Sequence, residues 1–361
     1  MITRKPDYRR LLTVLRREGE PDRVPFYEHF VDKEVVEAIL GEWLPPPTSR
    51  ESKVRYLTAL VKFYRKLGYD YVPFEVPLNL PRTNLLTAED TAPLSRGVRV
   101  WQDENKGVIE TMEDFEVYPW PDPEEAADLT YFEILGRLLP EDMGIVGGVA
   151  GGVFEHVSWL MGLRPLCRAV YRDRRLVEKM FDKVGSLIVK VDKEVVDICA
   201  EKLVALRMGD DLGYESGTFL SPELLRRYVF PWYRRCVEVA HSRGLPFILH
   251  SCGNRKMIMQ DLISVGIDAI HSFQDKIEPV WEAKSKYGDR VAVLGGVDVD
   301  KLCRLRTNPP KGVREANARE VRRGRGLRPR LGKHHNELYA NRKLPRDAGG
   351  GGKVPVPRVM D

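Results

Sequence analysis

Hydrophobic residues in the first 302 positions alternate between short apolar runs, typical of buried strands, and longer stretches with the three-four spacing of helices. The clearest helix is predicted over 174–202, where one apolar face is continuous. A short N-terminal helix and helices over 52–67, 221–242, 255–265 and 280–287 are also predicted. Strands are predicted over 23–30, 69–76, 143–150, 203–209, 246–250, 269–272 and 291–294, with a hairpin formed by 98–102 and 107–112.

Repeated strand–helix units with short connections indicate parallel strands joined by right-handed crossovers. Six or seven such units fit an α/β fold of the (β/α)8 TIM-barrel type better than a doubly wound sheet. No G-x-G-x-x-G motif follows an early strand, so the signature of a dinucleotide-binding sheet is missing. We therefore predict a single TIM-barrel domain over residues 1–302.

Charge is distributed unevenly along the chain. Of 58 Lys and Arg and 53 Asp and Glu, residues 303–361 hold 16 basic and 5 acidic ones, so residues 1–302 carry a net charge of −6 although the whole chain carries +5. An acidic body lacks the basic surface that nucleic acids require, so nucleic acid is not an expected partner. No apolar run approaches the roughly 18 residues of a membrane span, and the charged N-terminus does not resemble a secretion signal.

The last 59 residues do not continue the alternating pattern. They contain no Ile, Phe or Trp, are rich in Arg and Gly, and include a run of four glycines at 349–352. One interpretation is a disordered basic tail. A second is a frameshift between Asp300 and Lys311: back-translation of 333–353, read one base later, admits a strand, a loop and an amphipathic helix. On that hypothesis segment 303–361 is aberrant and the barrel lacks its native last β/α unit.

The nucleotide sequence tests the frameshift hypothesis directly. We expect the shifted frame downstream of codons 300–311 to stay open and to encode the strand, loop and helix that the degenerate codons admit. A stop codon in that frame close to the proposed break would contradict the hypothesis and favour a basic tail.

Five cysteines are scattered through the chain, at Cys167, Cys199, Cys236, Cys252 and Cys303. An odd and sparse set argues against a disulfide framework and favours a reducing cytoplasm. Three of them, Cys167, Cys199 and Cys236, fall in predicted helices and are expected to be core residues.

Polar side chains follow several of the predicted strands. In a β/α barrel the active site lies at the carboxyl ends of the strands, so these side chains are expected to meet at one rim. They are Glu28 and His29, Asp210 and Asp211, His250 and Cys252, His271 with Gln274, and Asp298.

His250 and Cys252 are the most specific pair. Residues two apart at the end of a strand point to the same side, so an imidazole and a thiolate could bind one zinc ion, Zn²⁺. Further ligands would come from the other rim residues, Glu28, His29, Asp210, Asp211 and His271, or from the lost C-terminal unit. The alternative is an inert buried cysteine beside a hydrogen-bonded histidine.

The tandem carboxylates Asp210 and Asp211 are candidate catalytic residues, together with His29. Two adjacent acids at a buried strand end are costly without a purpose, although one of them could equally cap the next loop or pair with Arg207. Candidate substrate-binding residues are Glu28, His156, His271, Gln274 and Asp298; His156 precedes an apolar run and a structural role for it stays open.

Several motifs together resemble the uroporphyrinogen decarboxylase superfamily, over residues 20–302. They are Arg207–Gly213, Ser221–Glu223, His250–Asn254 and Gly295–Asp298. The opening Pro21–Pro25 is similar to methyltransferase-like members. The resemblance implies a TIM barrel, and either a cofactor-free decarboxylase or a zinc methyltransferase that moves a methyl group from a corrinoid protein to a thiol such as coenzyme M. In those methyltransferases a His-x-Cys pair and a distant Cys hold zinc, and His250 and Cys252 match the pair.

Two departures from the family patterns bear on the reaction. The stretch 24–32 lacks the Arg-rich motif with which the decarboxylases bind substrate carboxylates, which argues against decarboxylation. In the reconstructed C-terminus the distant Cys is replaced by Ser or Ala, so another residue would complete the zinc site, or the branch performs a different reaction such as demethylation of a methoxylated compound.

Three hypotheses follow. The first is a zinc methyltransferase in which a thiolate accepts the methyl group from a partner's corrinoid, while Asp210 and His29 position the substrate. The second is uroporphyrinogen decarboxylase, with a tetrapyrrole substrate and Asp210 stabilising pyrrole protonation. The third is an inactive or truncated barrel. The oligomeric state stays open, with a homodimer as one option.

Overall fold

The computed structural model describes residues 4–91, 94, 97–199, 201–273 and 276–296. The expectations for Gln274, Asp298 and the segment 303–361, including its disorder and the frameshift, lie outside the described residues.

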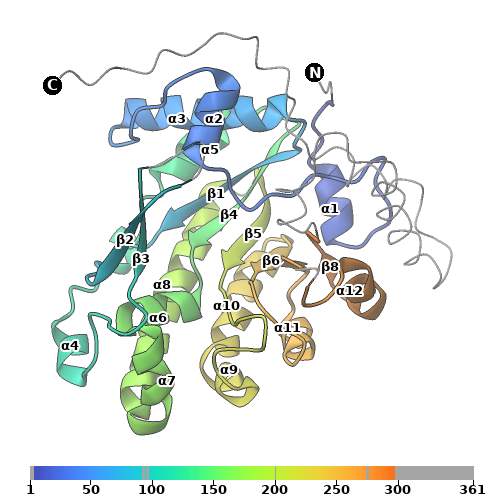
Figure 1. Ribbon diagram of the computed structural model, residues 1–361. Helices are drawn as coiled ribbons and strands as arrows, with labels where there is room; N and C mark the ends of the chain where they lie inside the picture. Colours follow the sequence, from blue (N-terminus) through green and yellow to red (C-terminus); the bar gives the residue numbers. More distant parts are fainter. Residues whose placement is uncertain (1–3, 92–93, 95–96, 200, 274–275, 297–361) are drawn as a thin grey trace.

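Six parallel strands form the central sheet, and their order in space follows their order in the chain (Figure 1). All neighbouring pairs are parallel. The strands are β1 (Tyr71–Pro77), β4 (Gly144–Ala150), β5 (Leu203–Gly209), β6 (Phe247–His250), β7 (Ala269–His271) and β8 (Ala292–Val293). Every residue of β5 is buried, as expected for a strand covered on both faces. The α/β class and the parallel sheet are thus as predicted, and they are consistent with a TIM barrel.

Helices connect and cover the strands. They are α1 (Arg9–Leu15), α2 (Lys33–Leu40), α3 (Arg50–Lys66), α4 (Met112–Val117), the 3-10 turn η1 (Pro123–Glu125), α5 (Thr130–Leu138), α6 (Val153–Met161), α7 (Leu163–Arg172), α8 (Arg174–Cys199), α9 (Pro222–Tyr228), α10 (Phe230–His241), α11 (Met259–Val265) and α12 (Val280–Tyr287). The single helix predicted over 221–242 is divided at Val229, because Pro231 lacks the N–H that a helix interior needs and is tolerated only in a first turn. No helix among these described segments is long and apolar enough to cross a membrane.

Two sequence-based predictions of strands are wrong. The segment 23–30 forms no ladder, and Pro25 removes one of the donors that a ladder requires. The segment 107–112 does not pair with 98–102; the amides of Val108 and Ile109 instead donate to the carbonyl of Leu160 at the end of α6. The hairpin consists of β2 (Leu85–Glu89) and β3 (Val98–Gln102), which pair antiparallel.

Helix α1 lies under the amino ends of the strands. Its Leu11 and Leu15 are buried in an apolar cluster with inward-facing residues of the strands, among them Val146, Val204 and Ile248. Helix α1 therefore covers the amino-terminal end of the sheet, and the carboxyl ends of the strands remain available for a site.

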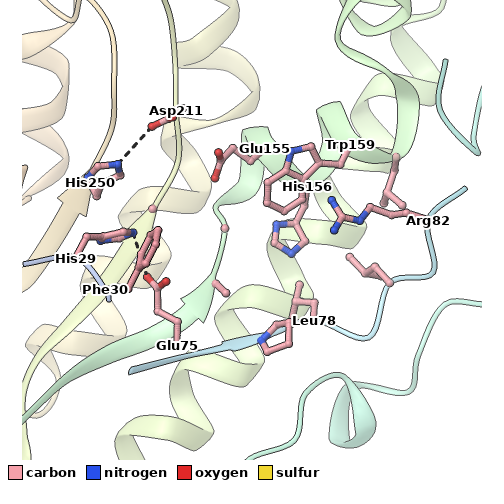
Figure 2. Close-up of a pocket in the computed structure, with 16 residues that line it drawn as sticks. His29, Phe30, Glu75, Leu78, Arg82, Glu155, His156, Trp159, Asp211 and His250 are labelled. Carbon is pink, nitrogen blue, oxygen red and sulfur yellow. Dashed lines mark ion pairs between the residues drawn. The ribbon is translucent and has the colours of Figure 1, made fainter. Parts of the chain in front are cut away.

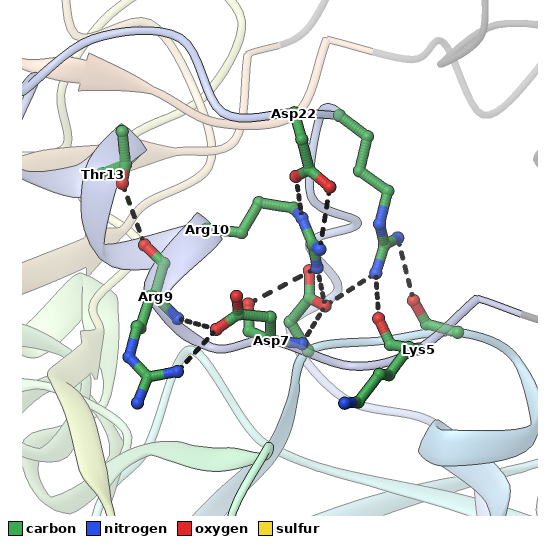
Figure 3. A network of polar contacts seen from close by, with 9 residues as sticks. Lys5, Asp7, Arg9, Arg10, Thr13 and Asp22 are labelled. Atoms are coloured by element: carbon green, nitrogen blue, oxygen red, sulfur yellow. Dashed lines mark hydrogen bonds and ion pairs between the residues drawn. The ribbon is translucent and has the colours of Figure 1, made fainter.

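A buried carboxylate fixes this N-terminal segment (Figure 3). Asp70, which immediately precedes β1, is fully buried and pairs with Arg10 at 2.6 Å and with Arg23 at 2.7 Å. It also accepts a hydrogen bond from the backbone N–H of Asp7 at 2.9 Å. Arg10 additionally pairs with the exposed Asp22. Three points of the N-terminal segment thus converge on one side chain at the start of the sheet.

Candidate active site

A cavity of about 480 Å³ lies at the carboxyl ends of the central strands (Figure 2). Four of the predicted site residues line it: His29, His156, Asp211 and His250. The lining residues that were not predicted as site residues include Glu75, Arg82, Glu155 and Trp159. The volume lies in the lower half of the range for small-molecule sites, roughly 300–1,000 Å³.

The pair His250 and Cys252 comes together as its spacing predicts. The sulfur of Cys252 lies 3.6 Å from His250 Nε2, and Asp211 Oδ1 lies 3.6 Å from the same nitrogen. Asp211 also accepts a hydrogen bond from the Cys252 backbone N–H at 2.6 Å, which holds the loop after β6 against the loop after β5. One nitrogen, one sulfur and one oxygen therefore lie within 4.8 Å of one another and could hold a metal ion.

Three imidazoles form a second group around His250. His29 stacks on His250 with ring centroids 4.2 Å apart, and His250 Nδ1 lies 2.7 Å from His271 Nδ1. Because a hydrogen bond needs one donor and one acceptor, one of these two Nδ1 atoms carries a proton and the other does not. The contact fixes the orientation of the His250 ring, and leaves its Nε2 directed toward Cys252 and Asp211.

Burial controls the protonation of His250 and Cys252. It lowers the pKa of His250 to about 4, against the opposing effect of Asp211. It raises the pKa of Cys252 to about 12, and the nearby Asp211 charge acts in the same direction. Both side chains are therefore neutral at pH 7 in the protein alone.

Asp210 and Asp211 point in different directions. Asp210 is fully buried and accepts hydrogen bonds from the backbone N–H groups of Phe154 at 2.9 Å and Glu155 at 2.7 Å, in the first turn of α6, and from the Tyr233 hydroxyl at 2.7 Å. Burial raises the pKa of Asp210 to about 7, although these donors oppose the shift. Asp210 does not line the cavity, and its observed contacts are with the first turn of α6 and with Tyr233. A catalytic role for Asp210 stays a prediction.

A buried ion pair was not predicted. Arg207, on β5, has a side chain only 1% exposed and contacts Glu75 of β1 through Nε and Nη2, both at 2.9 Å. Its Nη1 donates to the backbone carbonyl of His29. Arg207 thus pairs with Glu75 rather than with Asp210 or Asp211. The sequence did carry a signal for this ion pair, because Arg207 and Glu75 are each a charged residue inside an otherwise apolar strand.

The remaining predicted residues are spread around this core. Glu28 is half-buried and its backbone contacts the Tyr71 hydroxyl, away from the cavity lining. His271 lies behind His250 and contacts it. His156 lines the cavity and packs on Trp159, with ring centroids 4.9 Å apart. Their assignment to substrate binding stays a prediction.

The buried His156 predicts a loss of stability in acid. Its Nδ1 lies 3.0 Å from the Gly152 carbonyl, and burial lowers its pKa to about 4 against a smaller opposing effect of that hydrogen bond. In the unfolded chain the imidazole titrates near ~6.5, so the unfolded state binds the proton first as the pH falls. Stability is therefore lost as the pH falls from about 6.5 to about 4.

We expect the free energy of unfolding of the unaltered protein to fall between pH 7 and pH 5 by about 2 kcal/mol more than that of His156→Gln. Urea denaturation of both proteins at the two pH values measures the difference. Equal losses in the two proteins would show that His156 is not the group responsible.

The loop that carries Cys252 is held by a buried arginine. Arg255 donates to the carbonyls of Ser251 and Gly253, on either side of Cys252, and to that of Ser272 at 2.5 Å, next to His271. One guanidinium therefore ties the ends of β6 and β7 together beside the residues that could hold a metal ion.

A parallel β/α sheet whose strand ends place imidazoles, a thiol and carboxylates around a small-molecule cavity is the arrangement of a barrel-type enzyme. The chain belongs to the uroporphyrinogen decarboxylase family: the family model "Uroporphyrinogen decarboxylase (URO-D)" matches residues 100–329. The superfamily predicted from the motifs is thus confirmed.

Among solved structures, a methyltransferase from Methanosarcina mazei is similar in fold, with a TM-score of 0.62 and 19% identity over 88% of this chain and 89% of that one. A putative vitamin-B12 independent methionine synthase from Listeria monocytogenes matches at a TM-score of 0.43 and 11% identity, over 84% and 88% of the two chains. No curated protein sequence matches the chain.

Proposed function

We propose that this enzyme is a zinc-dependent methyltransferase, which moves a methyl group from a corrinoid protein to the thiol of a small acceptor. The observation that carries the proposal is the spacing of His250 Nε2, Cys252 Sγ and Asp211 Oδ1. Of these three residues, His250 and Asp211 line the cavity. The similarity in fold to the Methanosarcina mazei methyltransferase supports it.

The donor set fits a zinc ion. With Zn–S near ~2.3 Å and Zn–N near ~2.0 Å, tetrahedral geometry separates sulfur and nitrogen by about 3.5 Å. The 3.6 Å separations at His250 Nε2 match this value. Three protein ligands with the fourth position left for substrate is also the usual composition of a catalytic zinc site. In this proposal Asp211 is the third ligand, which the sequence motifs alone did not identify.

The reaction needs a thiol without its proton. A zinc ion at this site would lower the pKa of a substrate thiol and hold it as the thiolate. In the transfer, sulfur forms a bond with the methyl carbon, the cobalt–carbon bond breaks, and cobalt keeps the electron pair. His271 orients His250, and Arg255 holds the Cys252 loop, so that the protein positions the acceptor before the donor arrives.

The charge of the cavity argues against a tetrapyrrole substrate. Uroporphyrinogen carries many carboxylates, which the protein would have to neutralise. Among the described residues that line the cavity, Arg82 is the single Arg or Lys. One guanidinium cannot neutralise many carboxylates in a partly buried site, so a smaller substrate is favoured.

Metal content and transfer activity test the proposal on the full chain. Purified protein is expected to contain one zinc per chain by mass spectrometry. It is expected to form the methyl thioether from methylcobalamin and a small thiol under anaerobic conditions, with cobalt(I) visible by absorbance. Protein without zinc that instead converts uroporphyrinogen to coproporphyrinogen would overturn the proposal in favour of the decarboxylase.

Arg255→Met is expected to weaken zinc binding by at least about 10-fold, because residues that orient metal ligands typically matter by 10–100-fold. Arg255→Lys keeps the charge but cannot reach three carbonyls, so it is expected to restore little of the affinity. Competition with a chromogenic zinc chelator measures both. Unchanged affinity in a folded Arg255→Met protein would show that the clamp does not position the ligands.

A further inference from the structure

Arg82 extends into the cavity from the connection between β1 and β2 (Figure 2). Its guanidinium carbon lies 4.7 Å from the centre of the Trp159 ring, a stacking distance for a cation on an aromatic face. The connection is fixed next to it, where the Tyr118 hydroxyl donates to the Pro81 carbonyl at 2.8 Å. Within the described part of the chain, no carboxylate forms an ion pair with Arg82. The cavity thus holds a positioned cation without an anionic partner.

Two acids of the cavity lie apart from this cation. Figure 2 shows Asp211 and Glu75 on the side of His250 and His29, Arg82 on the opposite side with Trp159, and Glu155 between the two sides. Arg207 already pairs with Glu75, and burial raises the pKa of Glu155 to about 9, so Glu155 is mostly uncharged at pH 7. An anionic group of a bound molecule would therefore be attracted to Arg82, the single Arg or Lys among the described lining residues.

Apolar side chains make up much of the remaining lining. They belong to Phe30, Leu78, Leu80 and Leu160. His156, packed on Trp159, is neutral at pH 7 because burial lowers its pKa to about 4, so it does not supply a second cation. The space therefore suits a molecule with an apolar body and one charged end.

We propose that Arg82, held on Trp159, binds the carboxylate of a small substrate with an apolar body and directs its opposite end toward His250 and Cys252. The nature of the reacting end rests on the proposed function, whereas the carboxylate contact does not. A planar guanidinium matches a carboxylate with two parallel hydrogen bonds, and stacking on an indole orders it before the substrate arrives. Arg82 is exposed at the cavity, so its contribution is expected to fall as salt rises.

Binding of a matched pair of probes tests the contact without any chemistry. The pair is 3-phenylpropanoate and its neutral analogue 3-phenylpropanamide, titrated into the full chain by calorimetry at low salt. We expect the acid to bind at least 10-fold more tightly than the amide. Arg82→Gln is expected to remove this preference by weakening the acid alone, and Arg82→Lys to restore part of it. Arg99→Gln, which removes an exposed guanidinium paired with the buried Asp90 in the neighbouring hairpin, is the control and should leave the preference unchanged.

Equal affinity for acid and amide, or a preference that survives Arg82→Gln, would overturn the assignment. Binding of neither probe would overturn the substrate class. A second pair, 3-mercaptopropionate and 3-mercaptopropionamide in the transfer assay, separates the two proposals. If no methyl transfer occurs but the acid preference persists in calorimetry, the proposed function fails and the carboxylate site stands.

Discussion

Cys252→Ala is expected to reduce bound zinc from one per chain to background, and methyl transfer by at least about 100-fold. The variant removes the sulfur that lies 3.6 Å from His250 Nε2 and leaves one imidazole and one carboxylate. Two such ligands do not complete the usual catalytic set of three. The loop itself should persist, because Asp211 accepts its hydrogen bond from the backbone of residue 252 and Arg255 holds the flanking carbonyls.

Cys167→Ala is the matched control, since Cys167, on α7, is also a half-buried free thiol but donates to the Phe219 carbonyl and contacts none of the candidate ligands. It should keep both zinc and activity. Metal analysis and the transfer assay, with circular dichroism to verify folding, measure the outcome. Full zinc occupancy in Cys252→Ala would contradict the site described here, whatever the activity.

Asp70→Asn is expected to lower the free energy of unfolding by about 3 kcal/mol. Breaking a buried ion pair on one side leaves charge without compensation and typically costs ~3–5 kcal/mol. Here the carboxylate is fully buried and both Arg10 and Arg23 are largely covered, so two guanidinium groups would face each other across a neutral amide. Asparagine still accepts the Asp7 N–H, so the substitution isolates the charge.

Asp22→Asn serves as the control, because the Asp22 side chain is 70% exposed although it pairs with the same Arg10. Exposed pairs contribute roughly 0–1 kcal/mol, so a small loss is expected. Urea denaturation of the three proteins at pH 7 gives both values. If the two substitutions cost the same small amount, the N-terminal segment is not held by Asp70.

The local hydrophobic pattern was sufficient to predict most strands of the sheet. The run 203–209 is apolar and β-branched in part, and it is the strand β5 with the same bounds. The helix over 280–287 likewise has its predicted bounds. The segment 23–30 has a similar pattern but no ladder, because Pro25 interrupts the donors and the chain is held by the Tyr71 hydroxyl instead. The segment 107–112 was wrongly predicted to pair with 98–102 because the amides of Val108 and Ile109 bond to Leu160, a long-range contact that spacing does not encode.

For the site, spacing predicted which residues meet but not how they bond. His250 and Cys252 share a side because they are two apart at a strand end. The same alternation implies that Asp210 and Asp211 diverge, yet not which of them faces the cavity. The contact between His250 and His271 depends on the register of the consecutive strands β6 and β7, and the pairing of Arg207 with Glu75 joins strands far apart in the chain. Only the tertiary structure shows these two contacts.

Asp210 also has a mechanical consequence. Its carboxylate is bonded to the first turn of α6, and one peptide bond further along Asp211 contacts His250 and the Cys252 amide. Gly152, just before α6, leaves no room for a side chain, since a Cβ there would lie 2.2 Å from the Cβ of Asp210. An outward displacement of α6 must therefore stretch these hydrogen bonds or carry Asp211 with it, and such a displacement would be transmitted to His250 and Cys252.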